Sequence, residues 1–154
     1  MWLFALDHTS GATTTRIGAI LPLTGPGASF GQSSKNALMM ATDEINKNLE
    51  NARLELLVED GMTDPKASVS AFSRLYYAED TRIFITSISS VSLALAPLVE
   101  GKQSLLFANA SHPQVTTGRK FVFRYSNTAQ DESRVLHDFV SNRTKWSRLY
   151  IVSG

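Results

Sequence analysis

The chain has 154 residues, of which 43% are hydrophobic and 19% are charged, and its formal net charge is +1. This length suits one domain, the apolar fraction excludes intrinsic disorder, and the charge balance gives no reason to expect nucleic acid as a partner. The chain contains no cysteine, which excludes a disulfide, a thiolate metal site and a cysteine nucleophile.

The first fifteen residues differ from the rest of the chain. Trp2 to Leu6 is apolar, but Asp7 ends the run and no Lys or Arg precedes it. A complete signal peptide has a basic start and an apolar stretch of about 7–15 residues. Thr9 to Thr15 has the Ser/Thr/Gly composition of a linker. We therefore expect residues 1–15 to be a disordered leader or the remnant of a signal peptide.

From Arg16 onward, short apolar runs alternate with segments of helical periodicity. The runs predict strands at residues 16–23, 54–58, 83–85, 105–107, 121–123 and 149–152. They are apolar without alternation, which is typical of parallel strands that are covered on both faces. The predicted fold class is α/β, with a parallel β-sheet flanked by helices on both faces.

Two helices are expected in the first half of the chain. The first begins at Ser33 or Ser34 as N-cap and has its apolar stripe at Ala37, Leu38, Ala41, Ile45 and Leu49. The second has a strong start signal, with Asp64 as N-cap and Pro65 at the first helical position.

Two more helices are expected in the second half. One opens at Ser89 and Ser90 and ends at Gly101 as C-cap, and Pro97 should either kink this helix or confine it to its first turns. For the other, Thr128 and Asp131 predict a capping box. Its apolar stripe is Val135, Leu136, Phe139 and Val140. A parallel strand is normally buried by a following helix, so a chain that stops after residues 149–152 is expected to be truncated.

Ligands of open parallel sheets bind beyond the carboxyl ends of the strands. The glycine-rich segment 25–31 lies there, where a dinucleotide-binding loop would also lie. Phe30, however, takes the place of a required glycine, and Pro22 and Pro26 remove backbone donors. The spacing therefore favours a simple turn for the glycines over a nucleotide-binding loop, whereas Phe30 is a candidate apolar wall of a pocket.

Two further polar segments follow strands. Ser87, Ser89, Ser90 and Ser92 cluster at a helix start, where backbone N–H groups and a hydroxyl make a carboxylate site, although N-capping alone also explains them. Asn109 to Ser111 ends the next strand and should face the serines across a crevice, or else form an ordinary loop. This tripeptide and residues 142–144 also match the glycosylation sequon.

Catalysis finds little support in the sequence. His8, His112 and His137 lack metal-ligand spacing, and no catalytic residue, metal or cofactor is expected. Asp60 and Asp64 could form an acid/base pair, but a turn former and a helix cap are the competing interpretation.

Several linked segments carry a family likeness. They are residues 17–31 (IGAILPLTGPGASFG), Glu59-Asp60 with Asp64-Pro65, the Ser89-Ser90 helix start running to Ala96-Pro97, and residues 110–116 (ASHPQVT). In this order they resemble the first lobe of the type I periplasmic solute-binding proteins, in particular the leucine/isoleucine/valine-binding branch of ABC importers. Residues 121–124 resemble the family's first crossing between lobes. The resemblance implies an incomplete first ligand-binding lobe at 16–124 and the start of a truncated second lobe at 125–154.

The resemblance also implies a binding site. Ser90 would hold the α-carboxylate of an amino acid, and Ser111 would add a hydroxyl and a backbone N–H. A carbonyl near Asn109 would accept from the α-ammonium, and Phe30 would line the side-chain pocket. Val91 stands where the family often has Gly and could narrow the carboxylate pocket. The acidic partner of the ammonium is expected in the second lobe, outside this chain.

The implied function is capture of an amino acid, branched-chain-like, or a similar small ligand between two lobes, for a membrane ABC permease. The implied location is periplasmic or extracellular. Two alternatives stay open on the sequence: the extracellular sensor module of a receptor, which uses the same fold, and a small nucleotide-binding α/β enzyme.

Overall fold

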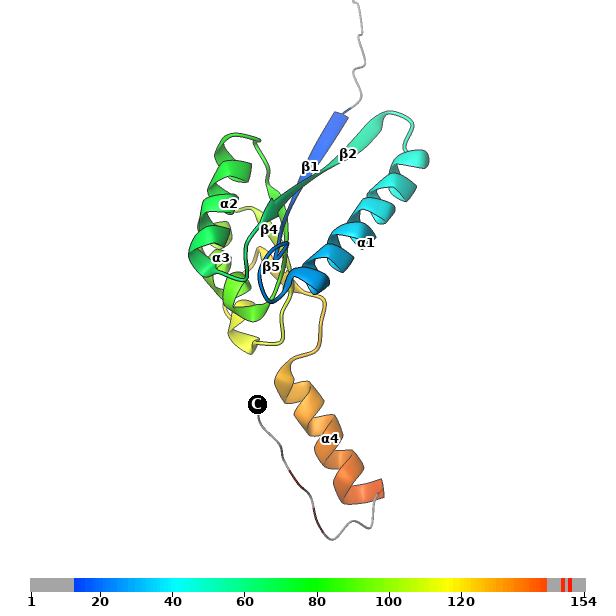
Figure 1. Cartoon of the computed structure of the whole chain (residues 1–154), viewed down its shortest axis with the longest axis vertical. Helices are drawn as coiled ribbons and strands as arrows, with labels where there is room; N and C mark the ends of the chain where they lie inside the picture. Colours follow the sequence, from blue (N-terminus) through cyan, green and yellow to red (C-terminus); the bar gives the residue numbers. More distant parts are fainter. Residues whose placement is uncertain (1–12, 144–147, 149, 151–154) are drawn as a thin grey trace, which may run out of the picture.

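The computed structural model describes residues 13–143, 148 and 150. Five strands and four α-helices alternate along them (Figure 1). In chain order these are β1 (Thr13–Leu21), α1 (Ala28–Lys47), β2 (Ala52–Asp60), α2 (Pro65–Tyr77), β3 (Ile83–Ser87), α3 (Ser89–Gly101), β4 (Leu105–Asn109), a 3₁₀ turn (Pro113–Val115), β5 (Val122–Arg124) and α4 (Ala129–Arg143).

The strands form one parallel sheet in the order β2-β1-β3-β4-β5. The five predicted strands that fall in this part of the chain are confirmed. The sixth, at residues 149–152, lies outside the described residues except for Tyr150. β1 begins at Thr13, so Thr13 to Thr15, expected in the linker, belong to the strand.

One face of the sheet carries the hydrophobic core. The α2 and α3 helices cover this face and pack against each other (Figure 1). Phe84 of β3, Leu95 of α3 and Leu106 of β4 are completely buried between these layers. The buried cluster continues through Ile20, Ala71, Phe72, Leu75, Val91, Ala96, Val99, Ala108, Ala110, Val115 and Val122.

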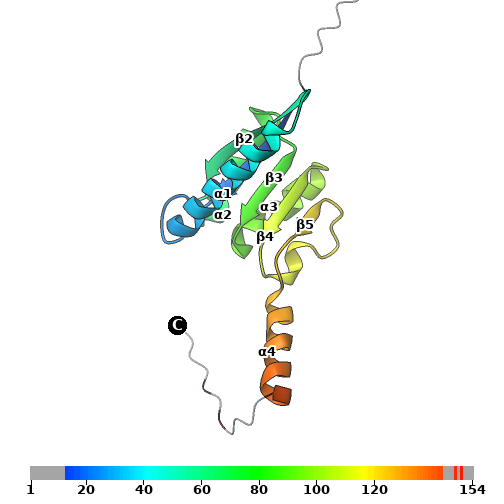
Figure 2. The ribbon, with the colours of Figure 1, turned by 90° about the vertical axis from the view of Figure 1, so that its right-hand side faces the viewer.

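The other face is covered only in part. The α1 helix lies over β1 and β2, and Figure 2 shows β3, β4 and β5 without a helix on this side. Helices on both faces confirm the predicted fold class, but the second layer is incomplete within the described residues.

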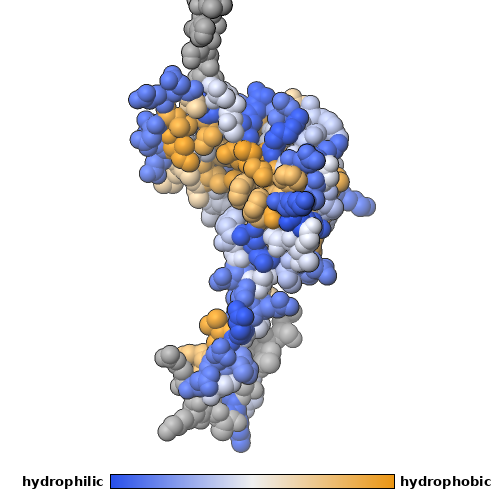
Figure 3. All heavy atoms as spheres, turned by 180° about the vertical axis from the view of Figure 1, so that it is seen from behind, coloured by the Kyte–Doolittle hydropathy of each residue, from blue (hydrophilic) through white to orange (hydrophobic). Residues whose placement is uncertain are grey.

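We call the uncovered region the open sheet face, formed by Ile83, Ile85, Leu105, Phe107 and Phe123. These residues alternate with core residues of the same strands, so their side chains point to the opposite face. The rings of Phe107 and Phe123 stack with centroids 5.6 Å apart and are 37% and 46% exposed at residue level. Figure 3 shows hydrophobic surface spread over the body of the molecule.

The start and the stripe of the first helix differ from prediction. The α1 helix begins at Ala28 without a side-chain cap, so Ser33 and Ser34 are not its N-cap. Ser33 lies inside the helix, and its hydroxyl donates to the Ser29 carbonyl at 2.9 Å. Gly31 packs closely against the backbone of Pro22, just after β1. A Cβ there would lie 2.0 Å from the Pro22 carbonyl oxygen.

The predicted stripe of α1 is largely exposed, which corrects the expectation that it faces a core. Gly31 is buried and the half-buried residues recur at helical spacing on the side toward the sheet: Ala28, Ser34, Lys35, Leu38, Thr42 and Asn46. At the other end, the Asn46 amide pairs with the backbone N–H and carbonyl of Leu54 at 2.8 and 2.9 Å. Ala37, Ala41 and Ile45 therefore lie outside the contact with the sheet, and Leu49 lies beyond the helix.

Both predicted acidic caps are confirmed. Asp64 Oδ1 accepts from the Ala67 N–H at 2.7 Å, with Pro65 next in the chain. At α4, the Thr128 hydroxyl oxygen accepts from the Asp131 N–H at 3.0 Å, and Asp131 Oδ2 accepts from the Thr128 N–H at 3.2 Å. This reciprocal pair is a capping box.

Some expectations for the later helices are corrected. The α3 helix continues past Pro97, so it is not confined to its first turns, and Lys102 rather than Gly101 is the C-cap. The α4 helix extends away from the sheet (Figures 1 and 2), so its predicted stripe finds no core among the described residues. Val135, Leu136 and Phe139 are exposed.

Candidate functional site

The loops at the carboxyl ends of the strands enclose a shallow pocket, which we call the loop pocket. It is lined by Phe30, Ile88, Ser89, Asn109, Ala110, Ser111, Ser126, Asn127 and Glu132. Another hollow lies between α1 and β2, at the side of the sheet. The loop pocket is the stronger candidate because ligands of parallel sheets bind beyond the strand ends.

The loop pocket gathers three of the four predicted site residues. Phe30 comes from the first turn of α1, and Asn109 and Ser111 come from the end of β4 and the loop after it. Ser90 is exposed and does not line the pocket, whereas its neighbour Ser89 does. The sequence motif pointed to both serines, and spacing alone could not distinguish them.

A strained turn directly precedes the two serines. Ile88 joins β3 to α3 with φ 75° and ψ 130°, a conformation that a β-branched residue adopts at a cost of about 1–3 kcal/mol. Its N–H donates to the Asn109 carbonyl at 3.0 Å, which fixes the turn to the neighbouring strand. Strain of this kind is concentrated at functional sites.

The start of α3 is open to an anion. No side chain caps it, in contrast to α2, where Asp64 does. The first N–H groups of a helix have no intrahelical partners and carry the positive end of the helix dipole. These groups are therefore available to a carboxylate in the loop pocket.

Ser89 links the start of α3 to the loop after β4. Its hydroxyl oxygen accepts from the His112 N–H at 3.3 Å. A serine hydroxyl that accepts a hydrogen bond still has its own proton to donate. Ser89 therefore has the polarity needed to bind a carboxylate oxygen.

The carbonyl groups near Asn109 already take part in the loop structure. The Asn109 carbonyl accepts from Ile88, the Ala110 carbonyl from the Ser126 hydroxyl at 3.1 Å, and the Ser111 carbonyl from the Ala129 N–H at 3.1 Å. Each carbonyl oxygen keeps a second lone pair. These bonds connect β4 to the start of α4 and fix the shape of the pocket.

Part of the expected serine cluster belongs to the core instead. The Thr86 and Ser92 hydroxyls hydrogen-bond to each other at 2.9 Å in the buried interior, and Ser92 also donates to the Ile88 carbonyl at 3.0 Å. Val91 is only 3% exposed and belongs to the hydrophobic cluster. The expectation that Val91 narrows the carboxylate pocket is therefore wrong.

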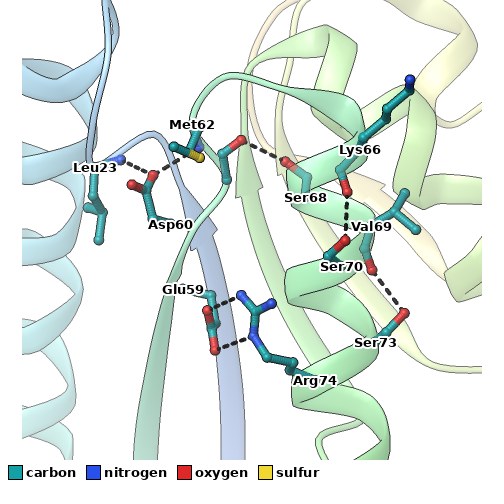
Figure 4. Close-up of polar contacts among 11 residues, drawn as sticks. Leu23, Glu59, Asp60, Met62, Lys66, Ser68, Val69, Ser70, Ser73 and Arg74 are labelled. Carbon is teal, nitrogen blue, oxygen red and sulfur yellow. Dashed lines mark hydrogen bonds and ion pairs between the residues drawn. The ribbon is translucent and has the colours of Figure 1, made fainter.

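Asp60 has a structural role in the turn after β2 (Figure 4). Its carboxylate accepts from the N–H groups of Leu23 and Met62, both at 2.9 Å, and from the Thr24 hydroxyl at 2.6 Å. Burial raises the pKa of Asp60, but these hydrogen bonds outweigh it, and the net pKa lies below the ordinary 3.8. With Asp64 acting as a cap, the turn-and-cap interpretation of the two aspartates is confirmed.

Metal ligands are not grouped in the described part of the chain, where no cluster of three or more His, Cys, Asp or Glu side chains could hold an ion. His112 Nδ1 accepts from the Gln114 N–H at 3.3 Å, and His137 lies exposed on α4. His8 lies outside the described residues.

The geometry and the sequence agree with one family. The profile of the periplasmic binding protein family matches residues 14–154, and the chain belongs to this family. The family resemblance and the α/β lobe expected from the sequence are thereby confirmed. The family is one of binding proteins, in agreement with the expectation that the chain is not an enzyme.

Similar proteins are named for branched-chain amino acids. The chain is 26% identical over 144 residues to the leucine-, isoleucine-, valine-, threonine- and alanine-binding protein of Pseudomonas aeruginosa, covering 90% of this chain and 38% of that protein. It is 30% identical over 142 residues to a Leu/Ile/Val-binding protein of Rhizobium johnstonii, covering 89% and 38%. The chain thus spans about 38% of the length of these relatives.

A solved structure gives the same result. The leucine-binding protein of Thermotoga maritima superposes with a TM-score of 0.75 at 26% identity, covering 81% of this chain and 36% of that one. No helix in the described residues is both long and apolar enough to cross a membrane.

Proposed function

We propose that the chain provides the first lobe of an extracytoplasmic solute-binding protein that captures a branched-chain-like amino acid for an ABC importer. The observation that carries this proposal is the loop pocket, in which Phe30, Ser89 and Ser111 lie beside the uncapped start of α3. The names of the relatives, which are binding proteins for leucine, isoleucine and valine, support the ligand class.

The pocket has the chemistry that a zwitterion requires. A charged group that leaves water must be hydrogen-bonded or paired. In our proposal the α-carboxylate binds the N–H groups of α3 with the hydroxyls of Ser89 and Ser111. A carbonyl near Asn109 accepts from the α-ammonium through its second lone pair. Phe30, which is 46% exposed, packs against the apolar side chain of the ligand.

The proposed site therefore differs from the sequence prediction at one position. Ser89 takes the carboxylate role first given to Ser90, and Phe30, Asn109 and Ser111 are kept. The second lobe, the closing of two lobes on the ligand, the permease partner and a periplasmic or extracellular location are parts of the same proposal.

Isothermal titration calorimetry of the purified protein with a panel of amino acids tests the function by measuring the heat of binding. We expect heat from leucine, isoleucine or valine, with the amino acid recovered unchanged. A panel in which no amino acid produces heat would refute the proposal.

Ser89→Ala tests the assigned carboxylate site, with Ser90→Ala as a matched control one residue away. A hydrogen bond to a charged group contributes about 1.5–3 kcal/mol, so Ser89→Ala should weaken leucine binding by roughly 10- to 100-fold. Ser90→Ala should change the dissociation constant less than about twofold, since its side chain does not line the pocket. The opposite ranking would return the role to Ser90.

A further inference from the structure

The loop pocket contains one ionisable side chain among the described residues that line it, Glu132. The other lining residues are apolar, hydroxyl-bearing or amide-bearing. The described lining therefore contributes one carboxyl group and no cationic side chain. The helix N–H groups would bind a carboxylate of the ligand, and the Glu132 carboxylate would repel it. A carboxylate in the pocket favours binding only if the ligand also carries a cationic group.

A hydrogen bond between the loop after β4 and the start of α4 positions Glu132. The Ser111 carbonyl accepts from the N–H of Ala129, the first residue of α4, at 3.1 Å. Glu132 follows three residues later, one turn along, and residues at this spacing share a helix face. The same loop that supplies Ser111 thus places Glu132 over the pocket.

The acidic residue before Glu132, Asp131, has a different role. Asp131 is occupied, because its carboxylate accepts from Thr128 in the capping box and pairs with Arg134 at 2.9 Å. Within the described chain, the Glu132 carboxylate makes no ion pair or hydrogen bond. It lines the pocket as an acceptor without a partner, while Asp131 stabilises the helix.

Two elements of opposite polarity line the pocket, the start of α3 and the first turn of α4. The start of α3, with Ser89, offers positive dipoles and donors, and the first turn of α4 offers a carboxylate. An α-amino acid carries its carboxylate and ammonium on the same carbon, so it can face both walls at once.

We infer that Glu132 is the counter-ion of the ligand's ammonium group and makes the site select amines over plain carboxylic acids. This inference rests on the proposed function, because it assigns a further residue of the same site. It places an acidic partner of the ammonium within this chain, on α4 at the expected start of the second lobe, rather than outside this chain.

The test compares leucine with 4-methylpentanoate, which is leucine without its ammonium group. Calorimetry with each ligand, or competition against leucine for the weaker one, gives the ratio of the two dissociation constants. In Glu132→Gln this preference for leucine should fall about tenfold or more, chiefly through weaker leucine binding. Glu132→Asp keeps the charge and should recover part of the preference.

Asp138→Asn is the matched control, since it removes an exposed carboxylate from the same helix that does not line the loop pocket. It should leave the preference within twofold of the unchanged protein, with all variants melting at the same temperature. If leucine binds but Glu132→Gln leaves the preference unchanged, the inference is overturned and the proposed function stands. If the unchanged protein binds no amino acid, the proposed function itself fails.

Discussion

Asp60 joins the two loops that precede α1 and α2. Its carboxylate holds the N–H groups of Leu23 and Met62 together, so the end of β2 and the turn after β1 share one acceptor (Figure 4). Met62 and Thr63 have φ values of 52° and 59°, which non-glycine residues adopt only when their surroundings impose it. The Asp60 hydrogen bonds help to impose this conformation.

Asp60→Asn should destabilise the protein by about 2 kcal/mol at pH 7, because hydrogen bonds to a charged group contribute about 1.5–3 kcal/mol. The folded pKa of Asp60 is lowered. The stabilisation is therefore complete above the unfolded pKa near 4 and is lost as the pH falls through the folded value. Urea unfolding at pH 7, 5 and 3 should show the difference between variant and parent shrinking only at pH 3.

Asp43→Asn is the control, because Asp43 is exposed on α1. It should change the stability by less than about 0.5 kcal/mol at each pH. A difference between Asp60→Asn and its parent that is the same at all three pH values would contradict the assigned role of the charge.

The sequence predicts residues well where the chemistry is local. Asp64 with Pro65, and Thr128 with Asp131, carry their partners within three residues, and all four have the predicted places. The choice between Ser89 and Ser90 was different. Both serines follow the backbone turn at Ile88, whose φ of 75° no local preference of isoleucine predicts.

Glu132 was missed as a site residue for a related reason. Its position depends on the contact between α4 and the loop after β4, in which Ser111 and Ala129 are 18 residues apart in sequence. The sequence signal that could have found it is an acid without a capping role in the first turn of a helix that follows a candidate binding loop.

At the scale of elements, α1 and α4 are the helices whose burial was poorly predicted, and α1 shows why. Its sequence shows an apolar stripe, but within the helix only Leu38 of this stripe is half-buried, whereas Ala37, Ala41 and Ile45 are exposed. Periodicity shows that a helix has an apolar side, but it does not show whether another element is present to cover that side. The strands and α2, whose partners are within this chain, were predicted more closely.

Gly31→Ala tests the contact that positions α1. The added Cβ would lie 2.0 Å from the Pro22 carbonyl oxygen, which is backbone and cannot move aside easily. We expect a loss of about 1–3 kcal/mol by urea unfolding, as for other overpacked sites, despite the better helix propensity of alanine.

Gly101→Ala is the matched control, since a Cβ at this last residue of α3 meets nothing within 4 Å. It should be neutral or stabilise by up to about 1 kcal/mol, because alanine favours a helix more than glycine does. Equal changes in the free energy of unfolding for the two substitutions would show that close packing at Gly31 does not position α1.

At the scale of the whole molecule, the open sheet face is an apolar area that the described residues leave in contact with solvent. Contiguous apolar patches of this kind are unusual on soluble monomers. The chain spans about 38% of the length of its curated relatives. The described structure therefore corresponds to only part of each relative.

The chain as given should bind an apolar fluorescent dye such as anilinonaphthalene sulfonate in its folded state. Replacing Phe107 and Phe123 together with Ser should lower the dye fluorescence at least twofold, because these stacked rings dominate the exposed part of the face. Tyr77→Ser removes an exposed aromatic from α2, on the other side of the sheet, and should leave the fluorescence unchanged. Unchanged fluorescence in the double variant would mean that the dye binds elsewhere.

The uneven layers also imply an order of local opening. The α2 and α3 helices each place several fully buried side chains in the core, whereas Gly31 is the one buried residue of α1. Segments with few buried contacts open at lower free energy than the global unfolding. Phe30 lies on the first turn of α1, so a ligand packed against it would bind only when α1 is packed on the sheet. Ligand binding would then shift the local opening equilibrium toward the packed helix. Occupancy of the pocket and the rigidity of α1 would in this way rise together.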